Sequence, residues 1–461
     1  MRTKIIILGL IISALFALLA YIPFGFQSLS TPPLNDHILI YFFLISLGLL
    51  ISYFAAYRLI KEEKSQRISK IIVLFALIFS VILILIPSIG SADVFNYIFR
   101  ARIQTVYGEN PYLVATEGFK SDLFYNFSPQ EWNYLPMQYG PLWTSLSIGF
   151  SYLAQDSFFW NQFLYKLLAL LTNFGIIYFI WKILGIINPD YRIRGILLYA
   201  WNPLILFEAV NNVHNDLLMI FFVVAAIYFF LKKKYLFCLL LLLFSVLVKY
   251  ITVLLFPVFL LFLWKEIIVP GERIKIFIKA AAILLVAAVL LYLPFWKGTG
   301  IFQGLADQSK IASYMNLSLF PSFLFNFILS LKSILTLTLD QIMKIVSIGG
   351  MIAFAIIYFW QLRLIKQKGD DFVHRNFLIL LGYILYAACF LQPWYFLWFL
   401  PLAVLIDKKY FPEFVFLFTL IGLLSYVFIV MSIILIVFFL ALLFLSLTTK
   451  KNYFPPFLGF H

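Results

Sequence analysis

Charged residues are scarce in this chain of 461 residues: they make up 12% of it, whereas an ordinary soluble domain carries about a quarter. Hydrophobic residues make up 64%. A soluble domain of this length could not bury so many apolar side chains, so the excess must face lipid. Cysteine is scarce too. Cys238 and Cys389 both lie inside apolar runs, which excludes a disulfide framework and leaves no metal-ligand spacing.

Apolar windows of about 20 residues, each long enough to cross a bilayer core, recur along the whole chain. The first, from Lys4 to Phe24, is too long for a signal peptide and lacks a clear small-residue cleavage site, which predicts a retained helix. We predict an all-α polytopic membrane protein, with one transmembrane domain over 1–461 made of about 12–14 helices. The expected spans are 4–24, 37–59, 70–88, 158–184, 193–208, 215–231, 235–248, 250–264, 276–295, 340–362, 376–391, 394–407, 412–427 and 430–447.

The formal charge of +14 is concentrated in short loops, which indicates the cytoplasmic side of a membrane rather than nucleic-acid binding. With the N-terminus in the cytoplasm, most lysines and arginines fall on that side. The long loop 89–140, expected to carry short surface helices, then lies on the extracytoplasmic face of the cell membrane. The apolar stretches 141–154 and 319–331 are too short to span and should lie along this face or dip into it. Four other polar segments share the face: Asn211–Asp216, Lys249, 296–318 and Gln392–Tyr395.

Asp93, near the start of loop 89–140, is the first candidate for catalysis. Asp93, Tyr97 and Arg100 recur at helical spacing and should share one face of a helix. A carboxylate in this position is suited to act as a general base. The alternative is that Asp93 caps a surface helix and pairs with Arg100, and the loop alone does not decide between the two. Later in the loop, Tyr139 precedes a Gly-Pro turn, either as part of a site or as an interfacial anchor.

The segment from Glu208 to Asp216 interrupts two apolar runs. Ionisable groups at a membrane face are costly, which favours a function. His214 and Asp216 would form a pair in which the carboxylate orients the imidazole. No third ligand follows at a useful spacing, so a zinc site is not predicted. The alternative is a helical hairpin with an Asn-rich turn at Asn211 and Asn212, but the acids and the histidine exceed what a turn requires.

Lys249 and the segment Gln392–Tyr395 are the remaining polar interruptions. Lys249 lies between two apolar runs and breaks the positive-inside pattern. A cation there suits a phosphate at the membrane surface, and snorkelling toward lipid headgroups is the alternative. Trp394 and Tyr395 beside a polar cleft suit sugar rings, although an aromatic belt has the same composition.

Taken in order, these segments resemble the GT-C superfamily of polyprenyl-phosphate-sugar-dependent glycosyltransferases. The resemblance is strongest to the integral membrane mannosyltransferases of bacterial lipoglycan assembly and their GPI-mannosyltransferase-like relatives. It covers residues 70–405 and rests on the order and shared placement of short motifs. These motifs are Asp93, Gly108–Tyr112, Tyr139–Leu142, Asn202–Pro203, His214–Asp216, Lys249 and Pro393–Tyr395.

The resemblance implies a bundle of the GT-C type and a transfer of a sugar with inversion at C1. The expected sugar is mannose. The donor would be linked to a polyprenyl phosphate, and the acceptor to a lipid or a glycan. Asp93 would deprotonate the acceptor hydroxyl, while Lys249, with Arg100 or Arg102, would stabilise the leaving phosphate. The other residues expected to bind the donor phosphate or the substrates are Glu208, Asn212, His214, Asp216, Tyr139, Gln392, Trp394 and Tyr395.

Some GT-C enzymes carry an Asp-X-Asp pair in the first loop, but here Ser91 and Phe95 flank Asp93 at that spacing. We therefore expect no metal and no cofactor, and membrane lipids rather than nucleic acid as partners. The main alternative is a secondary transporter or flippase. That class would show polar or broken-helix features near the bilayer midplane and an internal repeat, whereas these polar segments share one face and no repeat is seen.

Overall fold

The computed structural model describes residues 1–22, 36–60, 63, 65–312, 319–330, 337–365, 369–388, 391–408 and 410–427. Within these residues the chain is helical and contains no strand, as predicted. The α-helices are α1 (Arg2–Leu18), α2 (Asp36–Leu59), α3 (Gln66–Leu85), α4 (Asp93–Thr105), α5 (Pro141–Ala154), α6 (Phe158–Ile187), α7 (Arg192–Ala200), α8 (Pro203–Leu206), α9 (Asp216–Leu231), α10 (Tyr235–Val248), α11 (Phe256–Glu266), α12 (Pro270–Tyr292), α13 (Gln303–Ala312), α14 (Leu319–Ser330), α16 (Leu339–Arg363), α17 (Gly369–Gly382), α18 (Leu400–Ala403) and α19 (Phe411–Leu424).

Six helices in the described residues are long and apolar enough to cross a membrane: α1, α2, α3, α6, α12 and α16. Four shorter apolar helices accompany them: Asp216–Leu231, Tyr235–Val248, Phe372–Ala387 and Phe411–Leu424. Ala280 is the only buried residue of α12, so the apolar side chains of this helix remain on the outside, as lipid requires. These features confirm the predicted all-α polytopic membrane protein.

The predicted span 193–208 is not a single straight helix. Two helical segments, Pro189–Ala200 and Pro203–Asn211, meet at a bend of 49°. The Asn202 side chain accepts hydrogen bonds from the backbone N–H groups of Leu204 and Ile205, and therefore begins a new helix at Pro203. The apolar composition hides this break, because both halves remain buried.

The predicted span 394–407 is also broken. A 3-10 helix, Pro393–Trp398, precedes the four residues of α18. Pro393 and Pro401 each stand in a first helical turn, where the missing N–H is tolerated, so the chain restarts rather than continuing one helix. The predicted span 430–447 lies outside the described residues.

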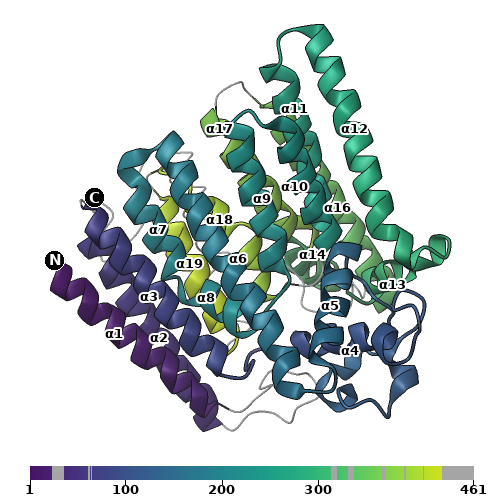
Figure 1. Ribbon diagram of the computed structural model, residues 1–461, viewed down its shortest axis with the longest axis horizontal. Helices are drawn as coiled ribbons and strands as arrows, with labels where there is room; N and C mark the ends of the chain where they lie inside the picture. The colour runs from purple at the N-terminus through teal and green to yellow at the C-terminus, as the bar shows by residue number, and fades with distance from the viewer. Residues whose placement is uncertain are drawn as a thin grey trace.

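The helices are arranged around α9, which packs between α6 and α10. Figure 1 shows α1, α2 and α3 side by side at one edge of the bundle and α12 at the opposite edge. Helices α4 and α5 lie together at one end, where the rest of the segment 89–140 also gathers. The short helix α5 contacts α4, α6 and α10, so the stretch 141–154 belongs to this end of the bundle.

Gly140 joins the segment 89–140 to α10. Its N–H donates to the Val248 carbonyl at 3.1 Å. A Cβ atom at position 140 would lie 2.1 Å from the Leu247 carbonyl oxygen, so only glycine allows this approach. The contact brings Tyr139 beside Lys249, the residue that follows α10.

Candidate active site

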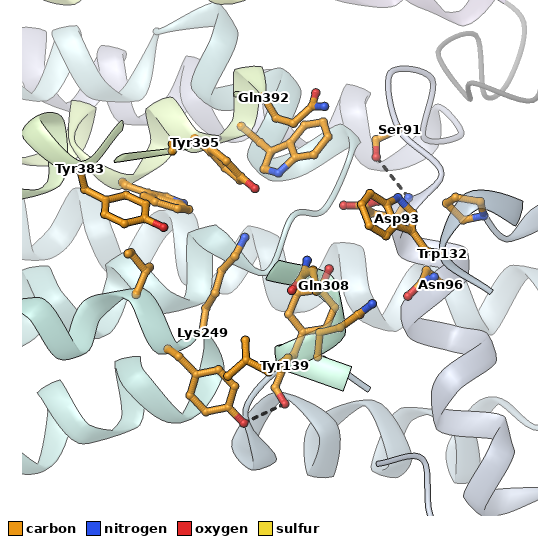
Figure 2. A pocket seen from close by; sticks show the side chains of 18 of the residues that line it. Ser91, Asp93, Asn96, Trp132, Tyr139, Lys249, Gln308, Tyr383, Gln392 and Tyr395 are labelled. Carbon is orange, nitrogen blue, oxygen red and sulfur yellow. Dashed lines mark hydrogen bonds between the residues drawn. The ribbon is translucent and has the colours of Figure 1, made fainter. Parts of the chain in front are cut away.

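A cavity of about 490 Å³ opens where the segment 89–140 meets the ends of several helices (Figure 2). Six of the residues predicted from the sequence line it: Asp93, Tyr139, Lys249, Gln392, Trp394 and Tyr395. The rest of the lining is Gly90, Ser91, Ala92, Asn96, Pro129, Glu131, Trp132, Gln138, Tyr250, Ile251, Val253, Leu254, Leu305, Gln308, Tyr383, Ala388 and Trp398. Residues from distant parts of the chain thus meet around one polar space.

Asp93 is the first residue of α4, and its carboxylate is the end of a row of three ionisable side chains. Its Oδ2 lies 3.3 Å from His214 Nδ1, and His214 Nε2 lies 3.3 Å from Glu208 Oε2. The side chains of His214 and Glu208 are fully buried, whereas that of Asp93 is 19% exposed at the cavity. The His214 ring stacks on Trp394 with centroids 4.2 Å apart. We call Asp93, His214, Glu208 and the residues 88–92 the acid wall.

His214 lies in the turn between the bent helix pair and α9. Burial lowers the pKa of His214, but the carboxylates of Asp93 and Glu208 outweigh burial and raise it to about 9. The imidazole is therefore protonated at neutral pH. Each imidazole nitrogen lies within ion-pair distance of one carboxylate, so the charged ring attracts both acids and favours this position of the Asp93 side chain.

Buried amides fasten the acid wall. Asn212 Oδ1 accepts from the Gly90 N–H at 2.9 Å, and its Nδ2 donates to Glu208 at 3.1 Å. Asn211 Oδ1 accepts from the Ile89 N–H, and its Nδ2 donates to the carbonyls of residues 83, 86 and 87. Tyr426 Oη donates to Glu208 at 2.6 Å. The predicted Asn-rich turn therefore determines where the backbone before Asp93 lies.

Lys166, within the apolar helix α6, was not singled out by sequence reasoning. Its ammonium group is buried and donates to the carbonyls of Leu83 and Ile86, at the end of α3. Lys166 and Asn211 thus satisfy the same unpaired carbonyls just before residues 88–92. A lysine inside an apolar run was the available signal, because such a cation requires partners within the protein.

Lys249 faces the cavity from the side opposite Asp93. We call Lys249, Asp216, Tyr395 and Trp398 the basic wall. Its Nζ lies 2.7 Å from Asp216 Oδ1, which also accepts from the indole N–H of Trp398. The ammonium group lies 5.2 Å from the ring centre of Tyr395 and 5.4 Å from that of Trp398. The Lys249 side chain is 20% exposed, so part of its charge remains available to a ligand.

The predicted pair of His214 and Asp216 is wrong. His214 pairs with the two acids of the acid wall, and Asp216 pairs with Lys249. The alternative pairing of Asp93 with Arg100 is absent as well, because the Arg100 guanidinium donates to Asn96 and to two backbone carbonyls. Asp93 meets His214, and Asp216 meets Lys249, across long stretches of the chain.

Arg100 and Arg102, predicted to help stabilise a phosphate, do not line the cavity. Arg100 is fully buried, and burial lowers its pKa to about 10. Arg102 lies 2.9 Å from Asp122 and 2.8 Å from Asp156, which neutralise it. Both arginines belong to α4 and hold the later part of the segment 89–140 against this helix. Neither is therefore free to meet a phosphate at the cavity.

The lining residues that were not predicted from the sequence include Glu131, Trp132, Tyr383 and Trp398. Glu131 and Trp132 lie in a short 3-10 helix, Gln130–Trp132, within the loop. An acid beside an aromatic residue in a loop is a weak signal, since solvent-exposed loops carry both. Among the described residues, no group of three or more His, Cys, Asp or Glu side chains is arranged to hold a metal ion.

The fold and the cavity define a multi-pass helical membrane protein in which a carboxylate, Asp93, and an ammonium group, Lys249, face a shared polar space. A family model described as alpha-(1->6)-mannopyranosyltransferase, N-terminal domain, matches residues 8–265. The match covers more than half of the chain, which therefore belongs to this mannosyltransferase family. It includes both Asp93 and Lys249, and it confirms the family resemblance drawn from the sequence. No curated protein matches the chain.

Proposed function

We propose that this protein transfers mannose from a polyprenyl-monophosphate donor to a hydroxyl group of a lipid- or glycan-linked acceptor, with inversion at the anomeric carbon. One observation carries the proposal: a carboxylate, Asp93, and an ammonium group, Lys249, line the same cavity from different sides (Figure 2). An in-line displacement requires a base behind the nucleophile and a positive charge at the leaving group.

The reaction is a single displacement. The acceptor hydroxyl gives its proton to Asp93 while its oxygen forms a bond to C1 of mannose. The bond between C1 and the phosphate oxygen breaks, and the electron pair stays on the phosphate. The charge that develops there is stabilised by Lys249, which has the partial exposure needed to reach it. The products are a mannoside and a polyprenyl phosphate.

The family description supports an expectation for the configuration of the donor. An α-mannoside formed with inversion requires a donor in which the phosphate is attached in the β configuration. The acid wall suits this role because His214 holds one oxygen of Asp93 at 3.3 Å. The other oxygen is then left for the acceptor hydroxyl, and a fixed base within hydrogen-bond reach is what general-base catalysis needs.

The two ends of α10 support a proposal for the side of the membrane on which the cavity opens. Its N-terminal end carries the cluster Lys232–Lys234, while Lys249 and the cavity lie at its C-terminal end. Fourteen helical residues separate the two ends by about 21 Å. Since basic clusters mark the cytoplasmic face, the cavity would open on the extracytoplasmic face of the cell membrane.

Membranes containing the protein would be incubated with radiolabelled polyprenyl-phosphate mannose and a methyl α-(1→6)-mannobioside acceptor. Asp93→Asn should lower the transfer rate by about 10²–10⁴-fold, the usual contribution of a general base. Glu109→Gln, which removes one charge from an exposed position of the same segment, is the matched control and should transfer normally. Equal rates for wild type and Asp93→Asn would refute the role of Asp93.

A further inference from the structure

Pro129, Glu131 and Trp132 belong to the cavity lining, and Glu131 lies close enough to Asp93 to feel its charge. Figure 2 shows Trp132 beside Asp93 and Lys249 across the cavity from both. None of these three loop residues has a place in the catalytic step described above. Their position on the side of the base is the starting observation.

Hydrogen bonds from α4 and from within the loop hold the segment around Trp132 in place. Arg100, fully buried in α4, donates to the Trp132 carbonyl at 2.9 Å and to the Leu135 carbonyl at 2.6 Å. Asn133 follows and is fully engaged at its side-chain oxygen, which accepts from Thr116 and Ser128. The loop segment is thus tied to the helix that begins with Asp93, so the two move as one unit and the surface is formed before any ligand arrives.

Glu131 differs from Asp122, another acid of this loop. Asp122 is neutralised by Arg102 at 2.9 Å, whereas no cation lies within ion-pair distance of Glu131 in the part of the chain that the structure describes. Burial raises the pKa of Glu131, and the nearby Asp93 raises it further. A partly buried carboxylate without a cation gains from hydrogen-bond donors, and sugar hydroxyl groups are such donors.

The polarity of the cavity divides it into two sides. Ile251, Val253 and Leu254, which follow Lys249 closely in the chain, supply apolar lining on the basic side. The side of Asp93 is polar, with Asn96 and Glu131 in its lining. In an in-line displacement the nucleophile enters opposite the leaving group, so whatever lies beyond Asp93 meets the acceptor and not the donor phosphate.

We propose that Glu131 and Trp132 form the acceptor subsite, which takes a hexose unit of a glycan: the indole ring stacks on the sugar face, and the carboxylate accepts hydrogen bonds from its hydroxyl groups. This inference rests on the proposed function, because that function identifies the side of Asp93 as the acceptor side. Aromatic rings combined with a few fixed polar groups are typical of binding sites that orient a small ligand.

The test measures binding of a methyl α-(1→6)-mannobioside to the purified full-length protein by calorimetry, without donor. Trp132→Ala and Glu131→Gln should each raise the dissociation constant about tenfold, the effect of losing one stacked ring or one charged hydrogen bond. Trp132→Phe should recover part of the affinity. The matched controls are Tyr134→Ala and Glu109→Gln, both at exposed positions of the same segment outside the cavity lining. They should bind as the wild type does.

An unchanged dissociation constant in Trp132→Ala and Glu131→Gln, or no binding by the wild type at millimolar concentrations, would overturn the subsite. Kinetics give a second check: the acceptor KM should rise about tenfold in both variants, while the donor KM stays within about twofold. A rise in the donor KM alone would assign these residues to the donor. If the wild type binds the mannobioside through these residues but transfers no mannose from the polyprenyl donor, the proposed function and the acceptor role fail, and Glu131 and Trp132 remain a sugar-binding site.

Discussion

The carboxylate of Asp93 and the ammonium group of Lys249 face the same cavity, but the molecule holds them by different means. The acid wall is tied to the bundle by buried hydrogen bonds from Asn211, Asn212 and Tyr426. Lys249 is an extended residue between two helices, and its ammonium group contacts one carboxylate and two aromatic rings. Several buried hydrogen bonds therefore hold the acid wall in place, whereas the Lys249 ammonium group is held by one ion pair and two aromatic rings.

This difference matches the tasks proposed for the two walls. A base must hold its carboxylate in one orientation while a hydroxyl group approaches. A cation that meets a phosphate must exchange an existing partner for the ligand and take it back after release. Lys249, shared between Asp216 and the cavity, is suited to such an exchange. Substitutions in the two walls should consequently separate stability from transfer.

After the loss expected for Asp93→Asn, the largest effect is expected at Lys249. Lys249→Met should lower the transfer rate by about 10²–10³-fold, because the charge on the leaving phosphate loses its stabilising partner. It should also lower the melting temperature, since the buried Asp216 carboxylate loses its cation and keeps the hydrogen bond from the Trp398 indole N–H.

The double variant Lys249→Met with Asp216→Asn sharpens this prediction. Removing both charges should restore the melting temperature in a thermal-shift assay while transfer stays as low as in Lys249→Met. Recovery of transfer in the double variant would mean that Lys249 serves only to neutralise Asp216.

The next effect is expected at Asn211. Asn211→Leu leaves the Ile89 N–H and three carbonyls without this amide, which should lower the free energy of unfolding by about 2–4 kcal/mol. The melting temperature and the fraction of active protein should fall together. Asn188→Leu is the control, because that amide makes one exposed hydrogen bond, to Asp407. Equal melting temperatures for the two variants would show that the acid wall does not depend on Asn211.

The smallest effect concerns pH. The pKa of His214 in the folded chain, about 9, lies above its ordinary value of 6.5, so its stabilising contribution is complete below pH 6.5 and is lost as the pH rises through about 9. The wild type should therefore lose melting temperature and transfer between pH 7.5 and about 9.5. His214→Gln, which carries no proton to lose, should start lower and show a flatter profile. Parallel profiles for the two proteins would contradict the charged state assigned to His214.

Much of the fold could be predicted from composition and apolar run length, because lipid tolerates few other arrangements. The predicted spans were wrong where a break of a few residues changes the direction of the helix axis. Asn202 and Pro203 end one helix and begin another inside a continuous apolar run, so 193–208 looked like one span. The same holds for 394–407, where two prolines restart the chain.

The cavity could be predicted in part for a similar reason. Asp93 and Lys249 stand out because a charge beside an apolar run is costly. Their partners could not be read from the sequence, since His214 meets an acid 121 positions earlier in the chain. The structure places Arg100 and Arg102 outside the cavity lining, because folding of the loop brings them partners such as Asp122 and the Leu135 carbonyl.

The most direct test of the two-wall arrangement is an experimental structure of the full-length protein with a polyprenyl monophosphate bound. We predict that a phosphate oxygen lies within hydrogen-bond distance of Lys249 Nζ, with Asp93 on the far side of the position where C1 of the sugar would lie. A phosphate bound at His214 or between Asp93 and Trp132, away from Lys249, would contradict the account.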